Sequence, residues 1–493
     1  MGSPSPNISE DLDKPDLDIS VPTETFGEMN RKRKIDADRF SPSQLDEVNS
    51  QKISDEIVNM IVTDKLPLEF LEGKGFNKFM QIVEPKYEIP SKTSIMCRIR
   101  AHYENAKEKL KDRLFECPDV AITAERWSSM ETKSFITVTA HFIDEKWQYI
   151  NFTLSTIELP DEPIFDDYFT NKLKEICEEW NIDRKITVVV HDIALKVENT
   201  FTREEKNFER SVPCFAQSLQ MCINNALVSK NLQELVIKSS SVVSHFQNSE
   251  QAKRALNENG INAKLNIEGH KLIQQKHNCW KSTFYMFESL LEQKQTVSDI
   301  LADRSITTAE EASFLALTTE EWYSIKSVTE ILKPFEISTT VLCSEQKLTL
   351  SIIRPLMTAI INNFLDKLTD LDTAKLRRFK NIIKRQITER FLCSVTYCKE
   401  EVLSIFDITS LMDPRYKNSL PEHIKNAGKT YLNRLLTEMK TEIVPKTEQK
   451  ITYYLDLLFD ETRDTMDPPE VDVYFLEPGI SKKECPLEWW KKR

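Results

Sequence analysis

The spacing of apolar residues divides the chain into an N-terminal helical stretch, a short region of strands and a long helical remainder. In the first stretch Ile53, Ile57, Met60 and Ile61 recur at i, i+4, i+7 and i+8, which places them on one face of a helix. Ser91 precedes a long mixed pattern and is expected to cap a second, longer helix. We therefore predict helices from about residue 46 to 118.

Residues 121–155 contain three segments in which apolar and polar residues alternate, a pattern that predicts strands. A helix is expected near 166–180, and the branched apolar run Ile186–Val190 predicts a buried strand. By pattern alone this region is α/β. Asp192 follows the last strand at its carboxyl end, where ligands gather in α/β sheets. Its carboxylate is therefore a candidate metal ligand or acid/base group, or else the N-cap of the next helix.

After about residue 200 the pattern is helical almost to the end of the chain. Apolar residues recur at helical spacing in two sets, which we expect to form helix core. The sets are Phe284, Phe287, Leu290 and Leu291, then Ile353, Leu356, Ile360 and Phe364. No repeat of fixed period is evident, so a solenoid is not expected.

Composition excludes several classes of protein. The 493 residues contain only 8 glycines and no glycine-rich phosphate loop, which argues against a kinase or nucleotide-driven motor. No apolar run is long enough for a membrane span, and no signal-peptide pattern is present. The 10 cysteines follow no pairing rhythm and contain no Cys-x-x-Cys, so neither disulfides nor a structural zinc site is expected. We predict no metal and no cofactor.

The net charge of −12 means that any affinity for nucleic acid must come from local basic clusters. One cluster, Arg31, Lys32, Arg33 and Lys34, lies in a polar tail and reads as a nuclear-import signal or as a plain solvated run. In the second, Arg377, Lys380 and Lys384 are expected on one helix face, opposite Leu376, Phe379 and Ile383. That basic face is either a solvated surface or a contact to the DNA backbone.

Several motifs stand in an order that resembles hAT-superfamily transposases, and among them the domesticated proteins that usually carry an N-terminal BED zinc finger. The motifs are Gly75–Phe76, Tyr87–Ser91, Thr123–Ser129, His191–Asp192, Val212–Gln220, Asn278–Thr283, Leu332–Glu336 with Thr339, and Met412–Lys417. The resemblance covers about residue 50 to the end. It implies a ribonuclease H-like core that a large helical insertion interrupts.

The same resemblance implies a catalytic site that has decayed. Related transposases hold two Mg²⁺ ions with three carboxylates. Glu125 stands where the family has Asp, and the residues after Asp192 include Lys196 where the family has an amide. Gln217 replaces the histidine of the family's Cys-x-x-His, and Cys279 replaces an arginine. The family's third carboxylate lies beyond the Trp-Trp landmark, and this chain stops soon after that landmark. We expect Glu125 and Asp192 to be vestigial and no catalytic set to be intact.

The expected fold is therefore a partial α/β ribonuclease H-like core, interrupted by a large all-α insertion and mainly helical overall. The expected divisions are a disordered acidic and polar tail (1–45), an N-terminal helical region (46–118), part of the ribonuclease H-like core (119–210), the helical insertion (211–470) and a truncated C-terminal dimerisation-like segment (471–493). We expect the BED finger of the relatives to be absent from this chain.

For function, the sequence favours a domesticated, catalytically inactive nuclear protein that acts in DNA or chromatin binding or in transcription regulation. The alternatives are a transposon relic with residual DNA binding, or a transposase fragment whose partner supplies the third carboxylate. DNA or chromatin proteins are the expected partners, with no membrane association. Because little of the dimerisation-like segment is present, we expect a monomer or a weak homodimer.

Overall fold

A computed structural model describes residues 47–129, 133–160, 166–192, 211–259, 271–343, 349–367, 372–392, 396–397, 400–401, 403–443 and 470–493. The chain forms two compact units, Met1–Lys107 and Glu108–Arg493, and the division falls inside one long helix. The finer division that we predicted from the sequence stays a prediction. The tail with Arg31–Lys34 lies outside the described residues.

The first unit is a small helical assembly around its own apolar core. Its elements are α1 (Glu47–Thr63), η1 (Leu68–Glu72), α2 (Lys74–Val83) and the first part of α3 (Lys92–Glu116). Ile57, Ile61 and Ile95 are buried in this core, so the predicted apolar face of the first helix is confirmed. The Ser91 hydroxyl accepts from the backbone N–H of Ser94 at 3.2 Å, which confirms the predicted cap.

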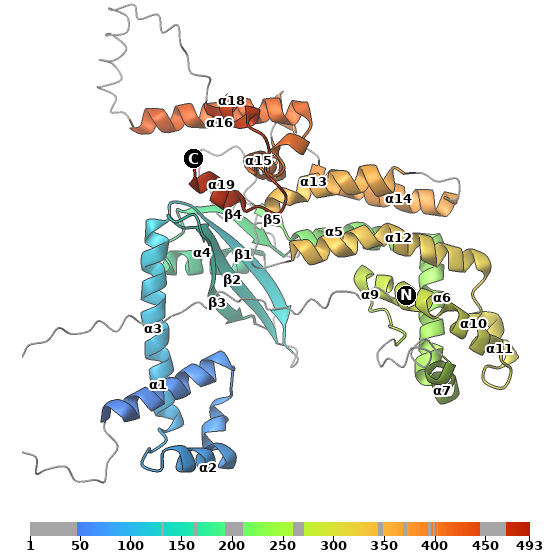
Figure 1. The fold of residues 1–493 in the computed structure, drawn as a ribbon, viewed down its shortest axis with the longest axis horizontal. Coiled ribbons are helices and arrows are strands. Elements are labelled where there is room, and N and C mark those ends of the chain that lie inside the picture. The colour runs from blue at the N-terminus through green and yellow to red at the C-terminus, as the bar shows by residue number, and fades with distance from the viewer. Residues whose placement is uncertain are drawn as a thin grey trace, which may run out of the picture. The chain divides into compact units, whose positions relative to one another are not determined.

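The second unit begins with a five-stranded sheet of order β3-β2-β1-β4-β5 (Figure 1). The strands are β1 (Val120–Ser128), β2 (Ser134–Ile143), β3 (Tyr149–Glu158), β4 (Ile186–His191) and β5 (Ser211–Pro213), with α4 (Asp166–Glu179) between β3 and β4. The first three strands form an antiparallel meander, and β4 pairs parallel to β1. The expected opening of a ribonuclease H-like core is therefore confirmed, although β5 was not predicted.

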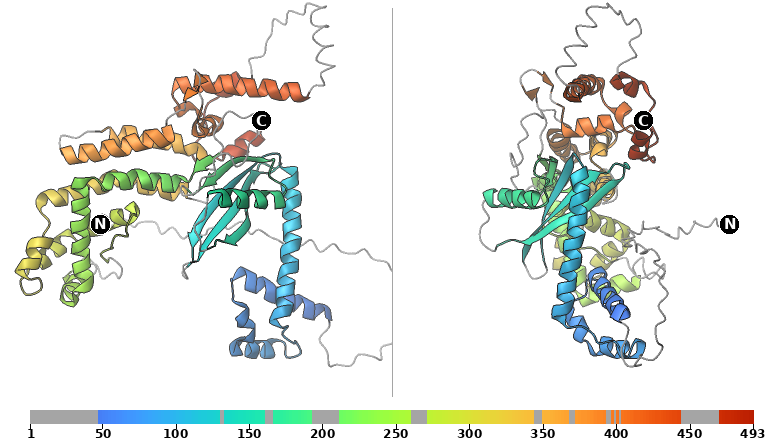
Figure 2. Two further views of the ribbon diagram at one scale, coloured as in Figure 1. Left: turned by 180° about the vertical axis from the view of Figure 1, so that it is seen from behind. Right: turned by 90° about the vertical axis from the view of Figure 1, so that its left-hand side faces the viewer.

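One face of the sheet is covered by α4, as Figure 2 shows. Apolar residues of β1 and β2, including Ile122 and Val138, pack there against Phe169 and Leu173 of α4. Leu114, near the end of α3, joins the same cluster. Alternation along the strands sends their other side chains to the opposite face.

The rest of the described chain is almost entirely helical, which makes the protein mainly helical as expected. Its first elements are α5 (Phe215–Leu227), α6 (Lys230–Asn248), α7 (Glu250–Asn259), α9 (Trp280–Glu292), α10 (Lys294–Ala302), α11 (Ala309–Leu315), α12 (Thr319–Leu342), α13 (Leu350–Ile360), η2 (Ile361–Leu365), α14 (Ala374–Ile387) and η3 (Thr388–Leu392). They are followed by β6 (Thr396–Tyr397), β7 (Glu400–Glu401), α15 (Ile405–Met412), η4 (Lys417–Ser419), α16 (Glu422–Ile443), α18 (Glu470–Leu476) and α19 (Pro486–Lys491).

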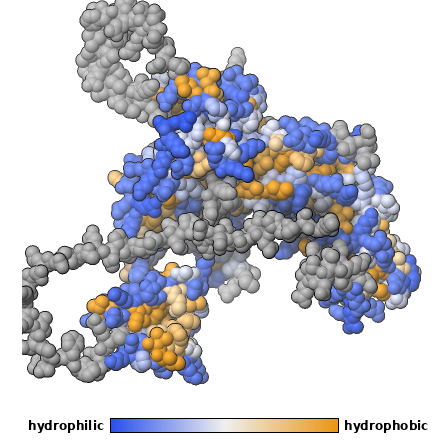
Figure 3. All heavy atoms as spheres, in the orientation of Figure 1, coloured by the Kyte–Doolittle hydropathy of each residue, from blue (hydrophilic) through white to orange (hydrophobic). Residues whose placement is uncertain are grey.

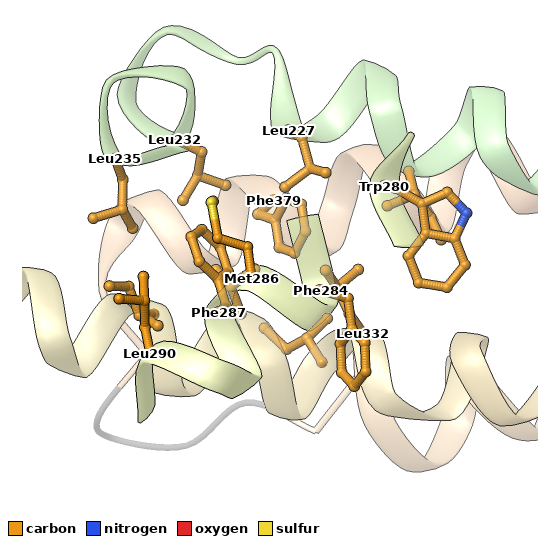
Figure 4. Close-up of a cluster of buried hydrophobic side chains, with 14 of the residues drawn as sticks. Leu227, Leu232, Leu235, Trp280, Phe284, Met286, Phe287, Leu290, Leu332 and Phe379 are labelled. Carbon is orange, nitrogen blue, oxygen red and sulfur yellow. The ribbon is translucent and has the colours of Figure 1, made fainter. Parts of the chain in front are cut away.

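A small apolar cluster that includes Leu411, Ile424 and Phe475 joins α15, α16 and α18. A much larger apolar cluster holds the helices from α5 to η3 together (Figure 4). Within it, α14 packs on α5 and α9 packs on α12. Phe284, Phe287 and Leu290 of α9 are fully buried, and Leu291 packs against the cluster from a partly buried position, so the first predicted core set is confirmed. Among the described residues, no helix combines the length and apolarity needed to span a bilayer.

The second predicted core set is wrong at one position. Ile353 and Ile360 are buried, but Phe364 is 46% exposed, and Leu365 is buried in its place. The cause is a π-helical turn over Ile361–Leu365, which is wider than an α-helical turn and moves the inward-facing position along by one residue.

The motif Met412–Lys417 anchors the C-terminal segment. The indole N–H of Trp490 donates to the carbonyl oxygen of Met412 at 3.0 Å, and the Lys417 ammonium donates to the carbonyl oxygen of Tyr474. That ammonium also lies 4.1 Å from the Tyr474 ring centroid and 5.7 Å from the Trp489 ring centroid. The two tryptophans thus pack against their own chain.

Candidate functional site

Parallel pairing of β1 with β4 brings the two candidate carboxylates to one edge of the sheet. Ala124 lies opposite His191 in the register, and the backbone N–H of Asp192 donates to the carbonyl oxygen of Ala124 at 3.2 Å. Glu125 and Asp192 therefore follow these paired positions and line the same cavity of about 140 Å³. The cavity is also lined by Thr123, Ala124, Arg126, Val190, His191, Cys214 and Gln217.

The far wall of the cavity comes from the short strand β5 and the helix that follows it. The backbone N–H of Cys214 donates to the carbonyl oxygen of His191 at 2.8 Å, which fixes the start of α5 beside β4. Gln217 therefore lies in the first turn of α5, and its amide donates to Oδ2 of Asp192 at 2.9 Å. From the sequence alone, Gln217 is only the residue that replaces the histidine of the family's Cys-x-x-His motif. Its contact with Asp192 was not predicted.

The two histidines of the sheet are held by hydrogen bonds at both ring nitrogens. His191 is buried, with Nδ1 2.7 Å from the carbonyl oxygen of Asp192 and Nε2 2.8 Å from the Ser211 hydroxyl. A carbonyl can only accept, so in the neutral ring Nδ1 carries the hydrogen and Nε2 accepts from Ser211. With both nitrogens engaged, His191 is not placed to act as a general base for a substrate.

His141, on β2, has the same kind of environment. Its Nδ1 lies 2.7 Å from the Tyr149 hydroxyl and its Nε2 lies 3.0 Å from the Thr123 hydroxyl. Burial disfavours the charged ring and lowers the pKa of His141 from 6.5 to about 4. Both histidines are therefore hydrogen-bonded side chains of the sheet, His191 buried and His141 half-buried.

The described residues do not fit the two Mg²⁺ ions of the transposases that the sequence resembles. Only Glu125 and Asp192 contribute carboxylates to the described lining of the cavity, and one Asp192 oxygen already accepts from Gln217. No group of three or more acidic, histidine or cysteine side chains in the described part of the chain could hold a metal ion. Mg²⁺ requires a near-octahedral oxygen shell at about 2.0–2.1 Å, so a poorly placed ligand weakens binding strongly.

The second candidate site, the basic residues of α14, differs from the expected arrangement. Lys380 is only 6% exposed, and its ammonium donates to Oδ2 of Asp372 at 2.8 Å and to the carbonyl oxygen of Lys367 at 2.8 Å. The shared basic face predicted from the sequence is therefore wrong for Lys380. The cause is that Asp372 and the carbonyl group of Lys367, both of which precede α14 in the chain, provide acceptors for the Lys380 ammonium on the buried side of the helix.

The other two members of that basic set are accessible. Arg377 is exposed, and its Nε donates to the carbonyl oxygen of Asp372 at 3.1 Å. The Lys384 ammonium is 2.6 Å from Oδ1 of Asp366, with the side chain 41% exposed. Contact of Arg377 and Lys384 with DNA stays a prediction, as does the import signal at Arg31–Lys34.

Comparison with known proteins agrees with this arrangement of sheet and helices. Residues 123–213 match the ZBED1 RNase-like domain, and residues 212–331 match the ZBED1 RNase-like helical domain. The boundary between the two matches falls at β5, where the sheet ends and the helices begin.

Similar full-length proteins include human zinc finger BED domain-containing proteins 4 and 6. The first is 24% identical over 82% of this chain and 33% of its own length, and the second is 25% identical over 79% and 40%. A protein of Talaromyces stipitatus, named provisionally as transcriptional regulator tpeD, is 22% identical over 84% of this chain and 51% of its own length. The chain thus spans between a third and about half of these relatives. Both comparisons thus find this chain similar to hAT-transposase-derived, BED-finger-like proteins, the family that its motifs resemble.

Proposed function

We propose that this protein is a transposase-derived regulatory module of the nucleus that binds DNA or chromatin proteins and does not cut DNA. The observation that carries the proposal is the hydrogen bond of 2.9 Å from the Gln217 amide to Asp192. The amide N–H engages one of the two Asp192 oxygens, and Glu125 is the only other carboxylate in the described lining of the cavity, where two-metal catalysis would need three. The names of the relatives, which describe zinc finger proteins and a transcriptional regulator, agree with a regulatory role.

Glu125 supports the same conclusion. Its side chain is one methylene longer than the aspartate of the active family, so its carboxylate would stand roughly an ångström or more from the position that the metal site requires. The residue is exposed at the edge of the sheet, and no described partner draws its carboxylate back toward Asp192. Two displaced or occupied carboxylates are a poor basis for two-metal catalysis.

The absence of nuclease activity is tested with supercoiled plasmid DNA in Mg²⁺ or Mn²⁺. We expect the plasmid to stay intact with the wild-type protein and with Asp192→Asn purified in parallel. A weak cleavage that is equal in both preparations is contamination. Cleavage that the wild type performs and Asp192→Asn abolishes would refute the inactive assignment.

DNA binding is tested by electrophoretic mobility at several salt concentrations. Each lost phosphate contact should reduce the slope of log affinity against log salt by about one. We therefore expect Arg377→Ala with Lys384→Ala to bind more weakly and to reduce the slope by about two. Lys326→Ala with Lys253→Ala removes two other half-exposed or exposed lysines and serves as the charge-matched control. Equal slopes for both double variants would remove α14 from the proposed contact.

Nuclear import through Arg31–Lys34 is tested by changing all four residues to alanine in a fluorescent fusion. Such a basic run is a receptor-read address, so the altered protein should stay largely in the cytoplasm. An unchanged nuclear signal would show that this run is not the address.

A further inference from the structure

Helix α2 of the first unit carries an apolar stripe that faces away from the core. Phe79, Ile82 and Val83 are 60%, 81% and 59% exposed, and their spacing of i, i+3 and i+4 makes them neighbours on the helix surface. Met80, on another side of the same helix, is buried in the core of the unit. Figure 3 shows hydrophobic residues gathered on the surface of these N-terminal helices. Single exposed apolar residues are ordinary, but a contiguous set marks a surface that binds something.

A row of lysines borders this stripe. Lys74 and Lys78 are both exposed and lie four residues apart, and Lys78 is in turn four residues before Ile82. The two lysines are thus about one helical turn apart along the edge of the stripe. Among the described residues neither lysine forms an ion pair. A ligand suited to this surface combines apolar side chains with a row of carboxylates.

The chain itself contains such a sequence. In residues 10–21, Leu12, Leu17, Ile19 and Val21 are interspersed with Glu10, Asp11, Asp13, Asp16 and Asp18, and only Lys14 is basic. From Asp16 onward acidic or polar and apolar residues alternate strictly. In an extended peptide this alternation presents an apolar edge and an acidic edge. We propose that residues 10–21 dock on the α2 stripe of the same molecule, with the apolar edge on Phe79, Ile82 and Val83 and the acidic edge along Lys74 and Lys78.

The length of the connecting residues and the resulting effective concentration favour docking within the same molecule over binding of a separate partner. Residues 22–46 separate the acidic segment from the start of α1, and 25 residues can span at most about 80–90 Å. That reach covers any part of a small helical unit. A covalent connection of this length gives an effective concentration of about a millimolar, so a weak contact suffices. Three exposed side chains fall far short of the roughly 1,000 Å² that a specific interface between separate proteins buries.

Photo-cross-linking of the full-length protein tests this contact directly. Phe79 is replaced by p-benzoyl-phenylalanine, a larger aromatic residue that the exposed site can hold, and an equal mixture of isotopically light and heavy protein is irradiated. Mass spectrometry should find cross-links to the peptide that contains Leu17, and only between light and light or heavy and heavy segments. Cross-links between light and heavy chains would assign the stripe to a second copy. Absence of any cross-link to residues 10–21 would overturn the proposal.

Charge reversal provides the matched variants. Lys74→Glu with Lys78→Glu should reduce the cross-link about fivefold, since two exposed charge pairs are lost. Adding Asp16→Lys and Asp18→Lys should restore it. Lys482→Glu with Lys483→Glu makes the same change of charge at exposed positions near the C-terminus and should leave the cross-link unchanged. A cross-link that survives the reversal on α2 would refute the charge complementarity. None of these readouts depends on DNA binding or nuclease activity, so the outcome is separate from that of the proposed function.

Discussion

Neutral His141 should make the stability of the sheet depend on pH in a way that one substitution removes. The ring bridges the hydroxyls of Tyr149 and Thr123, and burial holds its pKa at about 4 in the folded protein, against 6.5 for an ordinary histidine. The change that we propose is His141→Gln. The glutamine amide offers one donor group and one acceptor to the two hydroxyls, but it does not titrate.

The sign follows from which state takes up the proton first. As the pH falls below 6.5, the unfolded chain protonates His141 while the folded chain does not, so the free energy of unfolding decreases. The loss continues until the pH reaches the folded pKa of about 4. A difference of about 2.5 pKa units corresponds to a limit of about 3.4 kcal/mol, of which about 2 kcal/mol is already lost at pH 5.

The free energy of unfolding is measured by urea titration at pH 7.5 and at pH 5. Hydrogen exchange of the peptide that contains β2 reports the unfolding of the sheet. Other groups also titrate in that interval, so the quantity to compare is the change between the two pH values in the wild type and in His141→Gln. We expect the wild type to lose about 2 kcal/mol more than the variant. His277→Gln, at an exposed histidine, is the control and should behave like the wild type. If the wild type and His141→Gln lose the same amount, the histidine is not held neutral by the fold.

Three further predictions concern the helical region and its C-terminal segment. Lys380→Met removes the ammonium that pairs with the buried Asp372 carboxylate and should cost about 3–5 kcal/mol of unfolding free energy, whereas Lys384→Met, at a half-exposed pair, should cost less than about 1 kcal/mol. Equal losses in thermal or urea unfolding would contradict the burial of Lys380. Lys417→Met removes the charge between the Tyr474 and Trp489 rings while keeping the length of the side chain, and limited proteolysis should then release residues 470–493 several times faster; an unchanged rate would mean that the cation does not hold the segment. Because both tryptophans pack on their own chain, sedimentation should show a monomer or a weak dimer at micromolar protein, and a dimer that persists at nanomolar concentration would be inconsistent with that packing.

Four of the five strands of the sheet were predictable from the sequence because their signal is local. The alternation in β1 to β3 and the apolar run of β4 can each be recognised within a single strand. The resemblance to the transposase family, which implies a ribonuclease H-like order of strands, then places β4 beside β1. The helical core was predictable for the same reason as long as the helical period was regular. Phe364 was misplaced because a π-helical turn changes the period, and that turn leaves no mark in the spacing of apolar residues.

Lys380 shows a different limit of sequence patterns. A helical wheel divides residues by chemical type and assigns every lysine to the solvent, but a long side chain can be buried when a neighbouring segment supplies a carboxylate. Here Asp372 and the carbonyl oxygen of Lys367 both come from residues that precede α14 in the chain. Nothing in the basic stripe itself indicates which lysine these acceptors will reach.

The candidate site contains one feature that the sequence predicts and one contact that it does not. That Glu125 and Asp192 lie together follows from two neighbouring parallel strands, so the order of the motifs was enough to predict it. The contact between Gln217 and Asp192 depends instead on where α5 begins, and β5, which sets that point, has only three residues and therefore no usable period. Gln217 was thus recognisable from the sequence as a substitution. Its physical effect, an amide hydrogen bond to the Asp192 carboxylate, could be seen only from the geometry of β4, β5 and α5 together.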